Sequence, residues 1–171
     1  MNKTSSITRG GTFAALSILF IYLSSILPTN KLALLTLSSF IIVASIITIG
    51  IKASFIMYVS VSILSIFLVS SKGIALTYVM FFGLYGFLKL FIEKLRKLPL
   101  EIIIKFLFFN IILVLIYSLY EKLFIGVIDL SNLKFSIYLL IAAAQIIFII
   151  YDYILTLFVS YFNDKLLKKF L

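Results

Sequence analysis

Long apolar runs follow one another along the chain, and one or two charged or turn-forming residues separate each run from the next. A helix that crosses a bilayer needs roughly 20 mostly apolar residues. We therefore predict an all-α integral membrane bundle of six transmembrane helices, in a single domain over residues 1–171 without a separate soluble domain. The predicted spans are Gly11 to Leu27, Leu32 to Ile51, Ala53 to Ser71, Ile74 to Ile92, Ile102 to Tyr120 and Phe135 to Val159.

The breaks between these runs differ in strength. Pro28 and Asn30 predict a tight reversal, because proline disfavours helix in the residue before it and asparagine suits a turn. The single charge of Lys52 is the weakest boundary, and one kinked helix there would leave five spans. At Ser70 to Gly73 the glycine is able to take the positive φ of a helix end. The stretch Glu121 to Lys134 is predicted to be the longest loop, with its middle, LFIGVI, in the membrane interface.

Composition agrees with a membrane protein and excludes several kinds of site. Hydrophobic residues make up 64% of the chain and charged residues 12%, far from the balance of a soluble domain. Cysteine and histidine are both missing, which excludes disulfides, imidazole bases and zinc sites built on these ligands. The net charge of +9 lies next to apolar spans, so we expect anionic lipid headgroups rather than nucleic acid as its counterions.

The residue inventory also argues against an enzyme. Intramembrane serine proteases and metalloproteases need a histidine or a metal cluster, and this chain has no histidine. It has no Gly-x-x-x-x-Gly-Lys phosphate loop, so it cannot use ATP by itself. No pair of acids is spaced to hold a metal on one helix face. We therefore expect no catalytic residues, no cofactor and no metal, and a role in binding, transport or scaffolding.

Positive charge predicts the orientation of the chain. With six spans, one side of the membrane collects eleven of the 15 lysines and arginines and the other side four. Because lysine and arginine are enriched in cytoplasmic loops, we predict a multi-pass protein of the cell membrane with both termini in the cytoplasm.

Five of these cations lie in the segment FLKLFIEKLRKLPLEIIIKF, residues 87–106, which contains the fourth loop. They are Lys89, Lys94, Arg96, Lys97 and Lys105. One interpretation is that they only set the topology and touch lipid phosphate. The other is that the segment forms a docking surface, in which a short interfacial helix of mixed charge and spaced leucines meets a partner protein.

The first predicted helix begins with small residues in the stretch GGTFAALS. Gly10 pairs with Ala14 and Gly11 with Ala15 at a spacing of four, and Ser17 extends the stripe of small residues, as does Ser24. Such a stripe lets a neighbouring backbone approach closely, which favours helix association in lipid. The neighbour is either another helix of this chain or a helix of a second protein.

The third and fourth spans carry aromatic and small residues at helical spacing, which is typical of packing between helices rather than of ligand walls. These residues are Tyr58, Ser62 and Ser65 in the third span, and Tyr78, Phe82, Gly83, Tyr85 and Gly86 in the fourth.

Polar residues lie along one face of each of the last two spans. In the fifth span, Asn110 shares a face with Tyr117 and Glu121, and a lone amide there usually bonds a neighbouring helix. The sixth span carries a polar stripe of Gln145, Asp152, Thr156 and Asn163. Asp152 is a functional candidate because ionisable groups inside a membrane are costly, although pairing with Lys52 or Lys89 would give it a structural role.

A small-molecule site is predicted in the outer halves of the later helices. Aromatic walls with a few polar contacts are typical of such pockets. The candidate substrate-binding residues are Tyr78, Asn110, Tyr117, Glu121, Tyr138 and Gln145. The alternative is that the tyrosines belong to an interfacial belt, and that Asn110 and Gln145 bond each other.

The whole arrangement resembles the substrate-binding S component of energy-coupling factor (ECF) transporters. The resemblance rests on six short spans, the first-helix stretch TRGGTFAALS and the basic fourth loop. It extends to bacterial membrane proteins with stretches like LPTNKLALL, KGIALTYVMFFGLYGFLK and KFLFFN. It implies that Gly10, Gly11, Ala14 and Ala15 face a transmembrane coupling subunit, that two cytoplasmic ATPases supply energy, and that a vitamin or metal ion binds toward the outer side as substrate.

A second resemblance is to the small shape-determining membrane protein family MreD, which would make the chain a non-transport partner or scaffold protein of the cell envelope. That family tends to carry an acidic motif followed by a glycine-rich turn near its third span. In SIFLVSSKGIAL this chain has the turn but no acid, which favours the transporter interpretation.

Overall fold

A computed structural model of the chain describes the backbone of residues 3–27, 29–123 and 134–170, and the side chains of residues 4–27, 29–119, 139 and 141–162. All regular structure in this part is helical. The elements are α1 Lys3–Ile26, α2 Lys31–Ile49, α3 Ile51–Leu68, α4 Lys72–Thr77, the π-helical turn η1 Tyr78–Phe82, α5 Gly83–Glu93, α6 Leu98–Leu123 and α7 Lys134–Phe170. The chain divides into two compact units, Met1–Ile112 (unit 1) and Leu113–Leu171 (unit 2), which are described separately.

Six helices of the described residues are long and apolar enough to cross a membrane. They are α1, α2, α3, the continuous rod α4–η1–α5, α6 and α7. The predicted six-helix architecture is thereby confirmed. The alternative of one kinked helix across the second break is wrong, because α2 and α3 are separate helices that pack against each other.

The break between α2 and α3 lies at Gly50 and not at Lys52, where the sequence analysis placed it. Gly50 has φ 86° and ψ 162°, which is a conformation open essentially to glycine alone. Lys52 instead belongs to the first turn of α3. The predicted reversal before α2 is confirmed, because Asn30 has a left-handed conformation with φ 65°.

The break between α3 and α4 was predicted to use Gly73 at a positive φ, and this is wrong. Gly73 lies inside α4, and the break consists of extended residues at Val69 and Ser71. The Lys72 ammonium closes the end of α3, since it donates hydrogen bonds to the carbonyls of Ile66 (2.6 Å) and Val69 (3.3 Å). A cation at this position also complements the negative end of the helix dipole.

The last two helices are longer than predicted. α6 begins at Leu98 rather than at Ile102, so the fourth loop shrinks to Lys94–Lys97. α6 also continues to Leu123, into the stretch predicted as the longest loop. Most of that predicted loop, with the segment LFIGVI, lies outside the described residues.

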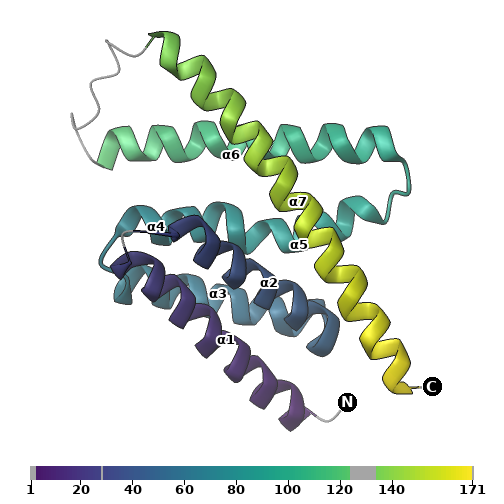
Figure 1. Cartoon of the computed structure of the whole chain (residues 1–171). Helices are drawn as coiled ribbons and strands as arrows, with labels where there is room; N and C mark the ends of the chain where they lie inside the picture. The colour runs from purple at the N-terminus through teal and green to yellow at the C-terminus, as the bar shows by residue number, and fades with distance from the viewer. Residues whose placement is uncertain (1–2, 28, 124–133, 171) are drawn as a thin grey trace. The chain divides into compact units, whose positions relative to one another are not determined.

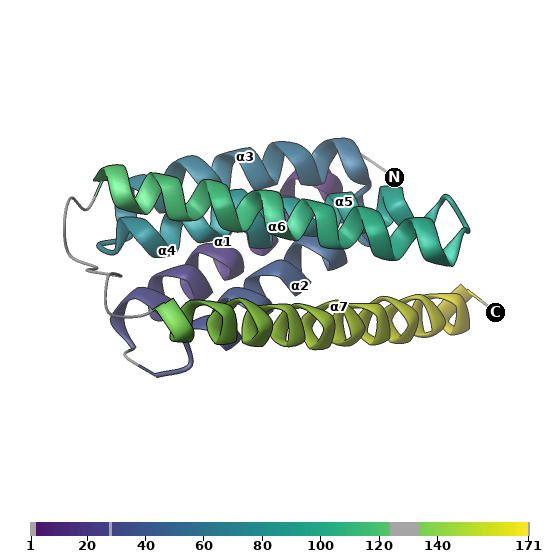
Figure 2. The ribbon, with the colours of Figure 1, turned by 90° about the horizontal axis from the view of Figure 1, so that it is seen from above.

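Unit 1 is built around α2, which packs against α1, α3, η1 and α5. Nine of its residues are buried: Leu35, Ser38, Ser39, Ile42, Val43, Ala44, Ser45, Ile46 and Ile49. Figures 1 and 2 show that α1 to α5 run back and forth between the two ends of this unit. The start of α1, the α2–α3 turn and the α5–α6 turn lie at the same end.

The π-helical turn η1 interrupts the fourth span at Tyr78–Phe82. The hydroxyl of Tyr58 on α3 donates a hydrogen bond to the carbonyl of Val79 inside this turn, at 2.8 Å. This bond satisfies a backbone carbonyl that the irregular turn would otherwise leave without a partner among buried apolar side chains.

Serine and threonine hydroxyls on several helices bond to carbonyls three or four residues earlier in the same helix. Examples are Thr36 to Leu32, Ser45 to Ile42 and Thr77 to Gly73, each between 2.7 and 2.8 Å. Large apolar side chains are exposed on every described spanning helix. Hydroxyls bonded in this way and an apolar surface together fit a bundle surrounded by lipid.

Unit 2 consists of the end of α6 and the long helix α7. Phe148, Tyr151 and Leu155 are buried on one face of α7. Further along, the rings of Phe158 and Phe162 lie one turn apart, with centroids 5.6 Å from each other.

Candidate functional site

A groove opens on unit 1 where α1 and α3 run past each other, with the end of α2 as its floor. Its volume is about 400 Å³. It is lined by Ser6, Ile7, Gly10, Gly11 and Ala14 of α1, Ile49 of α2, and Ala53, Ile56, Met57 and Ser60 of α3. We call it the α1–α3 groove. Three of the four small residues predicted for the coupling face therefore line one cavity.

The two glycines of this groove leave space that the chain does not fill. A Cβ added at Gly11 would meet nothing within 4 Å, and one added at Gly10 would meet only the Ile49 side chain at 3.6 Å, which is ordinary contact. Ala14 is half-buried at the groove wall, whereas Ala15 is exposed and does not line it. The predicted interface is thus divided between a concave part at Gly10, Gly11 and Ala14 and a neighbouring open surface at Ala15.

The continuation of the same stripe lies on the same face of α1, where it is packed inside the bundle. Ser17, Ile21 and Ser24 are fully buried within the bundle. The Ser24 hydroxyl donates a hydrogen bond to the Lys31 carbonyl at 3.2 Å, which ties the end of α1 to the start of α2. Of the two alternatives for the small-residue stripe, internal packing is realised at Ser17 and Ser24. The start of the stripe borders an open groove, and contact with a helix of a second protein there stays a prediction.

The residues predicted as a packing seam on the third and fourth spans do pack together. Tyr58, Ser62 and Ser65 are buried on α3, as are Tyr78, Phe82 and Tyr85 on the fourth span. The Tyr58 ring lies so close to Gly83 that an added Cβ would come within 2.3 Å of a ring carbon. These residues form the core of unit 1.

Two predicted substrate-binding residues lie in unit 1, and their environments differ. Tyr78 is fully buried in η1, beside Ser38 of α2 and with its ring 6.4 Å from that of Tyr58. Asn110 lies on an exposed face of α6, where its amide nitrogen donates a hydrogen bond to the Phe106 carbonyl at 2.8 Å. Tyr78 is therefore part of the core, and Asn110 bonds its own helix.

The other four predicted substrate-binding residues belong to unit 2. Tyr117 is exposed on α6, and Gln145 is half-buried on α7. Glu121 and Tyr138 lie in helices α6 and α7, but their side chains are outside the described set. No described cavity gathers the six residues, and the pocket stays a prediction.

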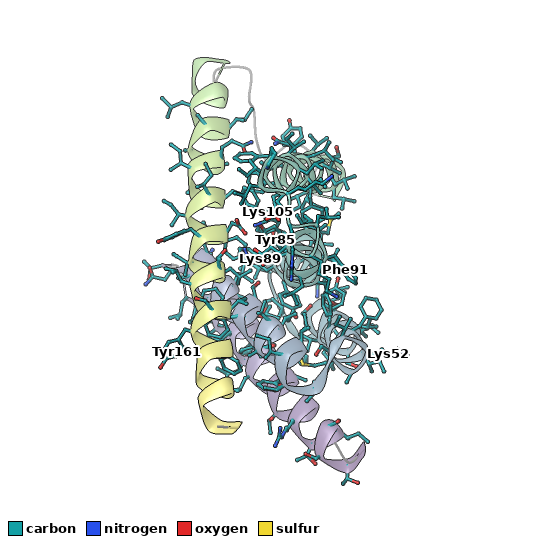
Figure 3. All side chains as sticks on the ribbon, turned by 90° about the vertical axis from the view of Figure 1, so that its right-hand side faces the viewer. Lys52, Tyr85, Lys89, Phe91, Lys105 and Tyr161 are labelled. Atoms are coloured by element: carbon teal, nitrogen blue, oxygen red, sulfur yellow. The ribbon has the colours of Figure 1, made fainter. Side chains whose placement is uncertain are left out.

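The structure separates the five cations of the segment 87–106 into two groups, and this division was not predicted. Lys89 on α5 is fully buried and Lys105 on α6 is nearly so. Their ammonium nitrogens lie 2.8 Å and 3.3 Å from the same oxygen, Oε1 of Glu93. Figure 3 shows Lys89 and Lys105 close together beside Tyr85. This triad ties the end of α5 to α6.

The remaining three cations, Lys94, Arg96 and Lys97, are exposed in the turn between α5 and α6. Arg96 takes a left-handed conformation with φ 51°, which reverses the chain. Two of the five cations thus serve packing between helices, and three lie on the surface at one end of the unit.

Asp152, the other candidate for a function inside the membrane, is half-buried on α7. Its backbone carbonyl accepts a hydrogen bond from the Thr156 hydroxyl at 2.9 Å. Among the described residues, no group of three or more histidine, cysteine, aspartate or glutamate side chains is placed to hold a metal ion. The predicted pairing of Asp152 with Lys52 or Lys89 stays a prediction.

The sequence analysis missed the contribution of α3 to the groove. Ala53, Met57 and Ser60 lie at spacings of three and four on one helix face, which was the available signal. It was overlooked because the same helix carries the more conspicuous row of Tyr58, Ser62 and Ser65 on the neighbouring face.

Comparisons of the chain with protein-family models, with curated proteins and with solved structures give no match.

Proposed function

We propose that the chain is a non-catalytic subunit of a membrane assembly, and that it binds a transmembrane partner through the α1–α3 groove. The observation that carries this proposal is the open space above Gly10 and Gly11, on a helix whose other end is packed into the bundle. Glycine in a helix interior costs about 1 kcal/mol relative to alanine. Neither glycine recovers that cost through close packing within unit 1, and a partner helix in the groove would do so.

The physics of association in lipid supports this role for the groove. Apolar side chains gain little from meeting each other in a bilayer, so helices associate where small residues permit close van der Waals contact. The groove offers small residues from both walls, which include Ala14 on α1 and Ala53 and Ser60 on α3. It is therefore suited to the backbone of a helix with small residues of its own.

Within this class, the substrate-binding subunit of an ECF-type uptake transporter is the form that the sequence resemblance favours. The partner would then be the transmembrane coupling subunit, with cytoplasmic ATPases beyond it, and the cargo a small molecule such as a vitamin. Two features support this form. Three of the four residues that the resemblance assigns to coupling, Gly10, Gly11 and Ala14, line the groove, whereas Ala15 does not. The chain also has no phosphate loop of its own.

The non-transport alternative, an MreD-like scaffold protein, gains support from the predicted substrate-binding residues. Tyr78 is committed to the core of unit 1, and Asn110 bonds the carbonyl of its own helix. A scaffold protein needs a partner groove but no substrate pocket.

A pair of matched substitutions tests the proposal. Ala14→Leu fills the groove, whereas Ala33→Leu adds the same atoms at an exposed position of α2 outside it. We expect protein purified from its native membranes to lose its membrane partner in the Ala14→Leu variant and to keep it in the Ala33→Leu variant. Mass spectrometry of the co-purifying proteins then distinguishes the two candidate functions. A transporter subunit requires a coupling subunit with ATPases among them, and a scaffold protein does not. Equal retention of every partner by both variants would contradict the proposal.

A further inference from the structure

The turn that joins α5 to α6, Lys94–Lys97, together with its flanking residues forms a charged and apolar edge at one end of unit 1. We call it the α5–α6 hairpin. Lys94, Arg96 and Lys97 are all exposed. Three cations within four residues create a strong local positive potential, and its effect depends on whether nearby carboxylates neutralise it.

The carboxylate that adjoins the hairpin in the sequence does not neutralise it. Glu93 immediately precedes it, but its Oε1 is engaged by the buried ammonium groups of Lys89 at 2.8 Å and Lys105 at 3.3 Å. The only other acid of unit 1 is Glu101, because residues 1–92 contain no aspartate or glutamate. Among the described side chains, no carboxylate forms an ion pair with Lys94, Arg96 or Lys97.

Large apolar side chains accompany these cations. Phe91, Leu95 and Leu98 are exposed by 57%, 49% and 74%. The Lys94 ammonium lies 5.5 Å from the centre of the Phe91 ring, in cation–π geometry. The hairpin thus presents aromatic and aliphatic groups directly beside its charges. Exposure of such large apolar groups to water is unfavourable.

The positive edge continues onto the neighbouring turn of unit 1. Ile51, at the α2–α3 turn, and Lys94 border the same small hollow, and Lys52 is exposed next to Ile51. Figure 3, which looks onto this end, shows Lys52 and Phe91 on the side of unit 1 away from the buried pair Lys89 and Lys105. The opposite end differs, because its Lys72 is occupied with the carbonyls of α3.

We propose that the α5–α6 hairpin binds the phosphate of anionic lipids, with Lys94, Arg96 and Lys97 at the headgroup and Phe91, Leu95 and Leu98 in the adjoining acyl region. Anionic lipid fits better than an acidic soluble protein because the hairpin joins two spanning helices. Its charges and its apolar groups therefore meet the headgroup level together. This inference goes beyond the partner groove and does not rest on it.

Lipid titration of the purified protein tests the proposal. We would add dioleoyl phosphatidylglycerol or dioleoyl phosphatidylcholine to the detergent-solubilised protein and measure bound lipid by native mass spectrometry. The parent should bind phosphatidylglycerol more tightly than phosphatidylcholine. Each basic residue near an anionic surface contributes about 1 kcal/mol, or roughly fivefold, so Lys94→Gln with Lys97→Gln should weaken phosphatidylglycerol binding roughly 25-fold.

A matched double variant at the other end controls for net charge. Lys31→Gln with Lys72→Gln removes the same two charges and should keep the preference for phosphatidylglycerol. A second variant, Leu95→Ser with Leu98→Ser, should weaken both lipids while keeping the ratio between them, and circular dichroism verifies that each variant is folded.

Three results would overturn the proposal. The first is equal affinity of the parent for the two lipids, and the second is an equal loss of affinity in the two lysine variants. The third is displacement of phosphatidylglycerol by inorganic phosphate at matched concentration, which would show a site for a free anion. Retention of an acidic protein by a parent that has no lipid preference would assign the hairpin to a protein partner instead.

Discussion

Small residues stand at two places in unit 1, and the chain uses them in opposite ways. At Gly83 and Gly86 in the fourth span, side chains of neighbouring helices occupy the space that a Cβ would need. At Gly10 and Gly11 in the first span, that space is open or only loosely bordered. Small residues at helical spacing therefore mark close helix packing in the fourth span and an open groove in the first.

The difference comes from what each glycine meets. Gly83 faces the ring of Tyr58, which is held in place because its hydroxyl bonds the Val79 carbonyl. Gly11 faces no such side chain. Where side chains of this chain occupy the space beside a glycine, the close contact stabilises the fold. Where that space is empty, a second protein can occupy it. The substitutions that follow separate the two kinds by their effect on stability, from the largest effect to the smallest.

Gly83→Ala should cause the largest loss. The new methyl group would come within 2.3 Å of the Tyr58 ring and 3.1 Å of the Tyr78 carbonyl, so the α3 contact must shift. Overpacking of a tight core typically costs 1–3 kcal/mol, and we expect about 3 kcal/mol here, measured by thermal or denaturant unfolding in detergent.

The matched control for this change is Gly11→Ala, which adds the same methyl group in the open groove. It should leave stability unchanged or raise it by up to about 1 kcal/mol, since alanine favours helix over glycine. Similar losses in both variants would show that the two sites do not differ.

Gly86→Ala should have an intermediate effect. An added Cβ would lie 3.1 Å from Val43 Cγ2 and 3.4 Å from Ile42 Cγ2, both of which belong to side chains of α2. These methyl groups can yield slightly, so we expect a loss of about 1 kcal/mol in the same unfolding assay. A loss as large as that of Gly83→Ala would mean that α2 and not Tyr58 sets the tightest contact.

Tyr58→Phe removes the bond to the π-helical turn while keeping the ring against Gly83. Hydrogen bonds between membrane helices contribute about 0.6 kcal/mol on average, and we expect a loss near that value. Tyr22→Phe is the control, because Tyr22 is exposed on α1. Equal stability of the two variants would show that η1 does not depend on the Tyr58 hydroxyl.

The sequence was sufficient to predict the number of spanning helices and the reversal at Asn30, because both depend on local properties. The length of an apolar segment determines whether its helix can cross a lipid bilayer. A left-handed backbone conformation favours a few residue types, asparagine among them. The break at Gly50 was missed because the charge of Lys52 is a conspicuous interruption, although only glycine suits the backbone there.

Properties that depend on the tertiary neighbour could not be predicted in this way. The sequence does not show that Lys89 and Lys105 are buried on Glu93 while Lys94 stays exposed, because the distinction arises from the packing of α5 against α6. For the same reason, the sequence could not show which of the small residues on α1 pack inside the bundle. Of the four small residues predicted for the coupling face, three line the groove, but the wall contributed by α3 was not predicted.

Photo-crosslinking in native membranes tests the central claim, that a partner helix occupies the α1–α3 groove. A benzophenone amino acid would replace Ala14 or Ser60, which line the groove, and Leu19 or Phe67, which are exposed on the same two helices outside it. The account predicts that both groove positions yield an adduct with one defined membrane protein, and that both outer positions yield none. The same adduct from all four positions, no protein adduct from the groove, or an adduct between two copies of this chain would contradict it.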